Sequence, residues 1–493
     1  MNMSQQAKQD VPGLSPAEEV RGFYERYPYP RPVDSLDKYR LLWQDRQRRR
    51  VDFRLFWPSR PYREDQTILI AGCGTSQAAK HAMRWPEAKV IGIDFSSTSL
   101  RCTEELKRKY ALDNLHVHQL PLERVGELET DFDQIVCTGV LHHLADPDAG
   151  LSALRGVLKP YGAMHLMVYA PYGRTGIYMM QDFCRRVGIS PTDEGIRDLI
   201  AALKSLPPGH PLENLLRDAP DFRHAAALAD ALLHPQDRAY SIPQLFAFLE
   251  RGGLTFGRWL NQAPYSPYCG VMATIPQAQR MAQLVPAEQY AAVELFRGTM
   301  VMHSVVAYRS DSPVGPQQPR FADEGWRTYV PIRQPNTICV QERLPPGAAA
   351  VLINRNHTYR DLVMPINAAE KRLFDAVDGT RSIGEIVDAI PHSQQETSLS
   401  EIARSFFERL WWWDQVVFDQ SLQTDGFLAR VESATNQANK STTERRRIMK
   451  TNPRMKMTTD IPPEITPDSV ETRLGTLKFF DKTWQPSEIE LVK

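Results

Sequence analysis

Three residues near the start of the chain have the types and the spacing to hold a cofactor. In the run ILIAGCGT, Gly72 and Gly74 flank Cys73 between an apolar strand-like run and a helical stretch. Glycines let the backbone pass close to a ligand, and the N-terminus of a following helix offers free N–H groups to a carboxylate or phosphate. Asp94 ends the next strand-like run, about twenty residues later, where a carboxylate can accept both hydroxyls of a ribose. The spacing predicts a cofactor with a ribose but does not choose which one.

Two adjacent histidines, His142 and His143, are candidates for proton transfer. They follow the fourth expected strand, at the carboxyl edge where ligands bind in open parallel sheets. A neutral imidazole has a pKa suited to accepting a proton from a hydroxyl or an ammonium group. A histidine at this place can equally be a capping or packing residue. Either residue could be the general base, and the sequence does not distinguish between them.

The segment from Phe132 to Ala170 indicates the class of enzyme. It reads FDQIVCTGVLHHLADPDAGLSALRGVLKPYGAMHLMVYA. It resembles class I methyltransferases, in which a hydrophobic strand ends in G-V-L-H-H-L and continues through D-P, a helix and V-L-K-P-x-G to another strand. The resemblance covers residues 65–170. A dehydrogenase would more often have a third glycine where Gln77 stands. The resemblance implies S-adenosylmethionine as the cofactor and methyl transfer as the reaction.

The same resemblance implies roles for the residues at the strand ends. Gly72, Cys73 and Gly74 would approach the methionine moiety of the cofactor, and Asp94 would bind the ribose hydroxyls. The positions that would contact the adenine or lie near the transferred methyl group are Phe95, Gln119, Leu120, Thr138 and Gly139. Many relatives have an acid where Gln119 or Leu120 stands, so the adenine contact departs from the usual pattern.

Aromatic segments on both sides of this region are candidates for binding the substrate. The run YPYPRPV, residues 27–33, is extended because its three prolines forbid a helix. It would serve either as a lid over the cofactor or as an aromatic strap on the outside of the domain. The residues that we expect to contact the substrate are Tyr29, Tyr169, Tyr172 and Arg174.

The elements that position these residues follow from the apolar periodicity. Short β-branched runs alternate with amphipathic helical stretches, which predicts an α/β fold with a doubly wound, seven-stranded sheet. Residues 173–239 contain leucine-spaced helical segments and no comparable strand, so we expect a helical insertion there. The expected strands are Thr67–Ala71, Lys89–Ile93, Leu115–Gln119, Phe132–Cys137, Ala163–Tyr169, Leu254–Leu260 and Met300–Arg309.

The remaining segments suggest four units along the chain. Residues 1–50 would form an N-terminal helix and the YPYP segment, and residues 51–310 the methyltransferase domain. Residues 325–420 show a helix, helix, helix, strand pattern, which predicts a small winged-helix-like α+β domain. This unit weakly resembles peptide-recognition domains, so it could bind a peptide or a second copy of the chain. Residues 421–493 are polar and are expected to be disordered.

Composition narrows the partners. The 493 residues carry 59 basic and 59 acidic side chains, so no net charge favours a long nucleic acid. The six cysteines are far apart and form no zinc-type cluster, so no metal is expected. No apolar run is long enough to cross a membrane, and we expect a cytoplasmic protein.

The acceptor and the activity itself stay open. An N-P-P-Y type motif and a Pro-Cys pair are both missing, so the usual base-methylating chemistries are unsupported. A small molecule or a protein side chain remains as the methyl acceptor. The alternative is an inactive methyltransferase fold that binds partners through its C-terminal unit, but the intact Gly72, Gly74 and Asp94 argue against it.

Overall fold

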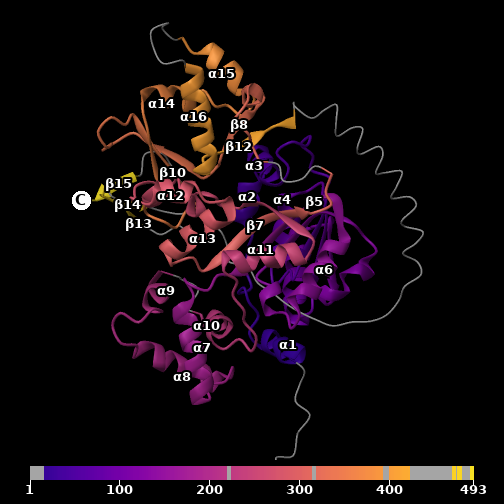
Figure 1. Cartoon of the computed structure of the whole chain (residues 1–493). Helices are drawn as coiled ribbons and strands as arrows, with labels where there is room; N and C mark the ends of the chain where they lie inside the picture. The colour runs from indigo at the N-terminus through magenta and orange to yellow at the C-terminus, as the bar shows by residue number, and fades with distance from the viewer. Residues whose placement is uncertain are drawn as a thin grey trace, which may run out of the picture.

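The computed structural model describes residues 16–218, 222, 224–313, 318–391 and 399–421, and three short strands nearer the C-terminus. A seven-stranded sheet lies at the centre of the molecule (Figure 1). Its strand order is β3-β2-β1-β4-β5-β7-β6, and β7 runs antiparallel to both neighbours. The strands are β1 (Thr67–Ala71), β2 (Lys89–Asp94), β3 (Leu115–Gln119), β4 (Phe132–Thr138), β5 (Leu158–Tyr169), β6 (Leu254–Trp259) and β7 (Met302–Arg309). The predicted sheet is confirmed.

Both faces of the sheet are covered by helices. On β1, Ile68 and Ile70 belong to one buried cluster, whereas Leu69 and Ala71 belong to another on the opposite face. This alternation follows from the two-residue period of a strand. The first cluster contains side chains of α3 (Arg46–Phe56), α4 (Gln77–Arg84) and α5 (Ser97–Tyr110). The second contains side chains of η1 (Leu122–Leu128), α6 (Pro147–Val157), α11 (Ile242–Arg251) and α13 (Pro286–Arg297).

The N-terminal segment forms three helices. α1 (Pro16–Arg26) is the helix expected before the YPYP segment. The basic stretch after that segment forms two helices, α2 (Asp37–Trp43) and α3. The chain breaks between them because the side chain of Asp45 accepts a hydrogen bond from the backbone N–H of Gln47 and starts a new helix.

The insertion after β5 is helical, as predicted. It consists of α7 (Thr175–Val187), α8 (Asp193–Lys204), α9 (Glu213–Asp218) and α10 (Ala225–Leu232). In Figure 1 these helices lie together below the sheet, with α1 beside them. Aromatic residues of α1 share one buried cluster with apolar residues of α7, α8 and α10. The N-terminal helix and the helical insertion therefore meet at this end of the molecule.

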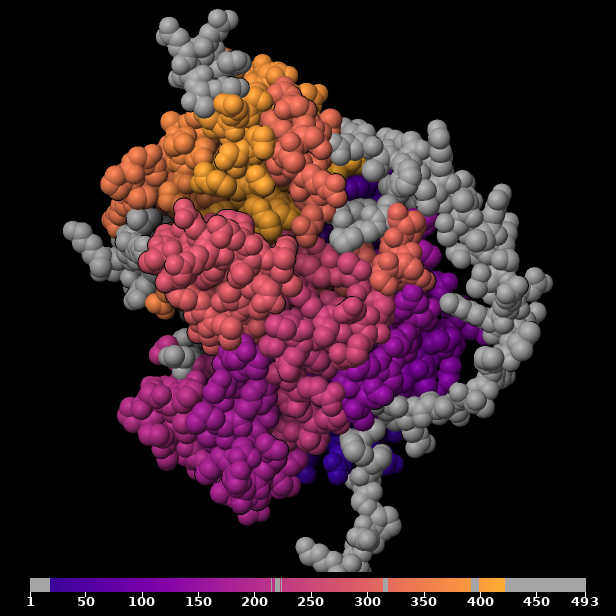
Figure 2. All heavy atoms as spheres, in the orientation of Figure 1, coloured from indigo at the N-terminus to yellow at the C-terminus, as the bar shows by residue number. Residues whose placement is uncertain are grey.

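The C-terminal unit lies at the opposite end of the molecule, against the segment around β6 (Figure 2). Its helices are α14 (Ala368–Asp375), α15 (Ile383–Ala389) and α16 (Leu399–Trp412), followed by β12 (Val416–Asp419). Asn367 and Ser382 cap α14 and α15 through complete capping boxes, as their types suggest. Four strands before the helices were not expected: β8 (Val330–Arg333), β9 (Thr337–Val340), β10 (Ala350–Asn354) and β11 (Val363–Ile366).

These strands form two small sheets. β9, β10 and β11 make an antiparallel sheet, and β12 returns to pair with β8. Most of the expected disordered tail lies outside the described residues. Within it, β13 (Ser469–Thr472), β14 (Gly475–Phe479) and β15 (Ile489–Val492) form a further antiparallel sheet, so the prediction of disorder is wrong for these three segments.

Candidate functional site

The turn between β1 and α4 has the backbone that a close ligand requires. Gly72 and Gly74 have φ angles of 72° and 53°, in the left-handed region that favours glycine. The backbone N–H groups of Gly72 and Cys73 both donate to the carbonyl of Ile93 at the end of β2. The turn is therefore tied to the neighbouring strand. The Cys73 side chain is fully buried and points into the core, so it is the backbone of this residue that can approach a ligand.

Asp94 lies beside this turn, at the carboxyl end of β2. One carboxylate oxygen accepts the N–H of Gly74 at 2.9 Å, and the other accepts the N–H of Ser96 at 2.8 Å. A carboxylate has about four lone-pair sites, so such a group can accept hydroxyl donors besides backbone N–H groups. The glycine turn and the adjacent carboxylate fit the methionine and ribose parts of S-adenosylmethionine.

The other predicted cofactor residues lie at the same edge with differing exposure. Phe95 is buried against the aromatic residues of α1. Gln119 is exposed, and its side-chain amide donates to the carbonyl of Phe95 at 3.0 Å, while the N–H of Leu120 donates to the carbonyl of Asp94. Thr138 is buried at the end of β4, and Gly139 follows it with a φ of 76°.

The N-terminal segment lies over the glycine turn. The hydroxyl of Thr75 donates to the carbonyl of Pro30 at 2.8 Å. Glu25, at the end of α1, accepts the backbone N–H groups of Ser97 and Thr98 at the start of α5. A carboxylate at this position interacts favourably with the helix dipole. The aromatic ring of Tyr29 is buried in the cluster formed with the insertion. This arrangement places the YPYP segment beside the turn, as a lid requires.

His142 and His143 lie in η2 (Leu141–His143), directly after β4, and both are buried. The ring of His142 lies 3.9 Å from the ring of Tyr169, centroid to centroid, and neither of its nitrogens has a hydrogen-bond partner among the described residues. His143 is held differently. Its Nδ1 lies 2.7 Å from the backbone carbonyl of Gln236, and its Nε2 has no partner within the described part of the chain.

Three residues that were not predicted from the sequence complete this group: Asp230, His234 and Asp237. Asp230 lies in α10, and His234 follows that helix. The hydroxyl of Tyr24 donates to Asp230 at 2.7 Å, and the ring of His234 lies 3.9 Å from the ring of His143. His143, Asp230 and His234 each offer a ligand atom within 4.8 Å of the others. The expectation that no metal-type cluster exists considered only local spacing, which does not detect such a group.

Arg174 and Tyr169 line the same region from β5 and the segment after it. The guanidinium carbon of Arg174 lies 3.4 Å from the ring centroid of Tyr169. Arg174 also forms an ion pair of 3.0 Å with Asp237, the third missed residue, and both side chains are buried. Tyr172, by contrast, is 39% exposed, and the structure does not bring it into this buried group.

Burial dominates the protonation of these groups. It lowers the pKa values of His142, His143 and His234 below that of an ordinary histidine, so all three are neutral at pH 7. It raises the pKa of Asp230 to about 7, although the hydrogen bond from Tyr24 acts in the opposite direction. Such shifts of several groups at one edge of the sheet are typical of a functional site.

One pattern in the sequence could have revealed Asp230 and His234. They stand four residues apart in the otherwise apolar run AAALADALLH, so a helix places them on the same face. A carboxylate and an imidazole in a run that is otherwise apolar are unusual, although α10 ends at Leu232 and His234 lies just beyond it. Their meeting with His143, however, depends on the packing of the insertion, which local patterns do not show.

Comparisons with known proteins agree with this geometry. Residues 69–164 match the family model described as a methyltransferase domain. An uncharacterized protein of Synechococcus is 34% identical over 236 residues, which cover 46% of this chain and 56% of that protein. A trans-aconitate 2-methyltransferase of Deinococcus radiodurans is 30% identical over 135 residues, 27% of this chain and 48% of that enzyme. The chain thus spans about half the length of these relatives.

A solved structure has the same fold over a larger share of the chain. The structure of PKMT2 from Rickettsia typhi covers 76% of each chain with a TM-score of 0.53 and 14% identity. The family match and the strand order together define the class: this chain contains a class I S-adenosylmethionine-dependent methyltransferase domain. Among the described helices, none combines the length and the apolar composition that a membrane crossing requires.

Proposed function

We propose that this chain transfers a methyl group from S-adenosylmethionine to a proton-bearing group of a small molecule or a protein side chain, with His143 as the general base. The observation that carries the proposal is the anchoring of His143. Its Nδ1 faces the carbonyl of Gln236, so its Nε2 is left with a lone pair in a buried site after β4. His142 has no such anchor and packs on Tyr169.

The cofactor residues and the base lie at one edge of the sheet. The glycine turn, Asp94 and η2 all follow the carboxyl ends of parallel strands. Helix α1 connects the two groups of residues. Its Tyr24 donates a hydrogen bond to Asp230, and Tyr24 lies in the same buried cluster as Phe95, next to Asp94. Ligands of open α/β sheets bind at this edge.

The chemistry divides between the cofactor and the chain. S-adenosylmethionine, when bound, supplies an activated methyl group and its leaving group. Gly72, Gly74 and Asp94 would hold it in place, and His143 would take the proton of the acceptor. Burial at the insertion and the YPYP segment would exclude water and orient the acceptor. The acceptor would reach Arg174 and Tyr169, whereas the C-terminal unit would bind a peptide or a second copy outside this site.

Calorimetry tests the cofactor directly. We expect S-adenosylhomocysteine to bind the full chain with one site and NADH to show no heat of binding. Residues 69–164, which include the fourth strand, match a methyltransferase domain. Binding of NADH without binding of S-adenosylhomocysteine would contradict the proposed activity.

Replacing Asp94 by alanine is expected to weaken S-adenosylhomocysteine binding by about 1.5 to 3 kcal/mol, roughly 10- to 150-fold, because hydrogen bonds to a charged acceptor are lost. Part of the loss would come from the turn, since Asp94 also holds the N–H of Gly74. Isothermal titration gives the affinity, and the melting temperature shows that the variant is folded. Asp65→Ala is the matched control, because Asp65 is an exposed carboxylate at the other end of the strands. Unchanged affinity in a folded Asp94→Ala protein would show that this carboxylate does not hold the ribose.

A further inference from the structure

The peptide unit of Gln236 contacts both His143 and His234. Its carbonyl lies 2.7 Å from Nδ1 of His143, and its N–H donates to Nδ1 of His234 at 3.0 Å. The side chain of Gln236 is itself anchored, because its amide donates to the carbonyl of Leu144 at 2.8 Å. One backbone unit therefore faces two imidazole rings with an acceptor on one side and a donor on the other.

These contacts fix opposite tautomers. A carbonyl only accepts, so Nδ1 of His143 carries the proton. A backbone N–H only donates, so Nδ1 of His234 carries the lone pair. In a neutral imidazole one nitrogen is a donor and the other an acceptor. Nε2 of His143 is therefore a bare acceptor, and Nε2 of His234 is an N–H donor.

Both Nε2 atoms lack a hydrogen-bond partner among the described residues. His143 is 1% exposed and His234 is 8% exposed, and their rings lie 3.9 Å apart with an angle of 32° between the planes. A buried donor and a buried acceptor without partners destabilise the fold unless something satisfies them. A ligand that offers one donor and one acceptor to this pair would satisfy both.

We infer that the methyl acceptor is a hydroxyl group and that His234 positions it by donating a hydrogen bond to its oxygen. This inference rests on the proposed methyltransferase function. A hydroxyl has one O–H and two lone pairs. The O–H donates to Nε2 of His143, one lone pair accepts from Nε2 of His234, and the other remains free to attack. The pair of histidines matches that set of groups.

Other acceptors fit the pair less well. A neutral amine has a single lone pair, which the reaction itself requires, so nothing is left to accept from His234. An ammonium group has donors and no acceptor, and a carboxylate has no proton for His143 to remove. In the reaction with a hydroxyl, the oxygen–carbon bond forms as the carbon–sulfur bond breaks. The sulfur leaves with the bonding electrons, and the proton passes to Nε2 of His143.

A divalent metal is the competing occupant, since His143, His234 and Asp230 are all of metal-ligating types. Coordination through Nε2 of His234 would need a lone pair on that atom. Its Nδ1 lone pair is already used by the N–H of Gln236, and a neutral imidazole does not offer two lone pairs. The hydrogen bonds of Gln236 therefore favour a hydroxyl over a metal ion.

The tautomers can be measured without knowing the acceptor. Nitrogen NMR of the full chain labelled with 15N-histidine, assigned with His143→Gln and His234→Gln, reports which nitrogen of each ring carries the proton. We expect a proton on Nδ1 of His143 and on Nε2 of His234. The same tautomer for both rings would overturn the inference. Zinc binding would overturn it as well: the 15N signals of both rings would then shift on addition of zinc chloride, and the shift would be complete at one equivalent.

Methyl transfer tests the acceptor class. The full chain is incubated with S-adenosylmethionine carrying a 13C methyl group and with a bacterial metabolite extract or a bacterial protein extract. Mass spectrometry and NMR then show whether the labelled methyl is bound to oxygen or nitrogen. We expect oxygen. A methyl on nitrogen, or no labelled product despite intact S-adenosylhomocysteine binding, would overturn the inference. Failure to bind S-adenosylhomocysteine would instead contradict the proposed function.

Variants separate the two histidines. His143→Gln is expected to lower kcat about 100- to 10,000-fold, since it removes a general base. His234→Leu should lower kcat or raise KM about tenfold, because it removes one hydrogen bond. His234→Gln should recover much of that loss, because its amide nitrogen can donate from nearly the same place. A purely structural role for His234 predicts no recovery. S-adenosylhomocysteine affinity should be unchanged in all three variants.

Discussion

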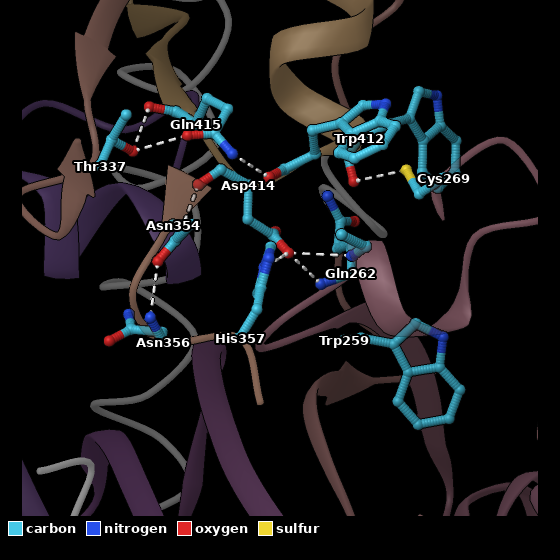
Figure 3. Close-up of polar contacts among 12 residues, drawn as sticks. Trp259, Gln262, Cys269, Thr337, Asn354, Asn356, His357, Trp412, Asp414 and Gln415 are labelled. Carbon is cyan, nitrogen blue, oxygen red and sulfur yellow. Dashed lines mark hydrogen bonds and ion pairs between the residues drawn. The ribbon is translucent and has the colours of Figure 1, made fainter. Parts of the chain in front are cut away.

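Replacing Asp414 by alanine is expected to lower the free energy of unfolding by about 3 to 5 kcal/mol, the usual cost of leaving a buried charge without its partner. The Asp414 carboxylate is buried between the C-terminal unit and the segment after β6 (Figure 3). It accepts the backbone N–H groups of Gln262 at 2.7 Å and Ala263 at 2.9 Å. It also faces the guanidinium group of Arg258 at 3.4 Å and Nε2 of His357 at 3.1 Å.

Removing this carboxylate therefore affects two units at once. The buried Arg258 would lose its counter-ion, and two backbone donors would lose their acceptor. Asp414 also has a φ of 52°, which asparagine tolerates better than alanine, so Asp414→Asn should cost less. Asp388→Ala is the matched control, because Asp388 forms an exposed ion pair in the same unit and should cost under about 1 kcal/mol. Urea denaturation measures all three, and equal stabilities of Asp414→Ala and Asp388→Ala would show that this contact does not join the units.

Much of the sheet could be predicted from the sequence because its signals are local. The runs at β1 and β3 have the same limits in the sequence and in the structure, since β1 is apolar, β3 alternates apolar and polar residues, and turn residues bound both. The glycine turn is equally local, because only glycine readily adopts the φ angles found at Gly72 and Gly74. The role expected for Asp94 could be predicted as well, because the residue ends a strand-like run in the sequence.

The short strands of the C-terminal unit could not be predicted from local sequence patterns. β9 and β11 are each four residues long, and β9 is half-buried along its whole length, so β9 shows no alternation and β11 (VMPI) contains no polar residue that would reveal one. β8 finds its partner, β12, more than eighty residues later. Short strands of this kind are stabilised by pairing across the unit and not by their own sequence.

The candidate site divides in the same way. His142 and His143 could be proposed together because both follow β4, but the choice of His143 depends on the carbonyl of Gln236, some ninety residues away. Asp230 and His234 come from the insertion, whose packing against α1 brings them to the sheet. The exposure of Tyr172 could not be predicted from the local sequence either, because it depends on how the chain turns after β5.

Asp230 should make the stability of the protein fall as pH rises toward neutrality. Burial raises the pKa of Asp230 to about 7, whereas an aspartate in the unfolded chain has a pKa of about 3.9. Between these values the folded state holds a proton that the unfolded state has lost. Folding is therefore favoured at the acid end of this range, and this contribution is lost as pH rises through 7.

The variant Asp230→Asn isolates this effect, because asparagine can still accept the hydrogen bond from Tyr24 and does not titrate. We expect the stability of Asp230→Asn relative to the wild type to rise by on the order of 3 kcal/mol between pH 5 and pH 8, at 1.36 kcal/mol per pKa unit. His143, His234 and Arg174 surround the site in both proteins, so their own titrations largely cancel in the difference. Urea denaturation at several pH values gives the comparison.

Asp182→Asn is the control. Asp182 is exposed, and its hydrogen bond with Arg186 lowers its pKa, so it is ionised throughout this range in both the folded and the unfolded states. A difference for Asp230→Asn that is as flat with pH as that of Asp182→Asn would show that Asp230 is ionised in the folded protein well below pH 7.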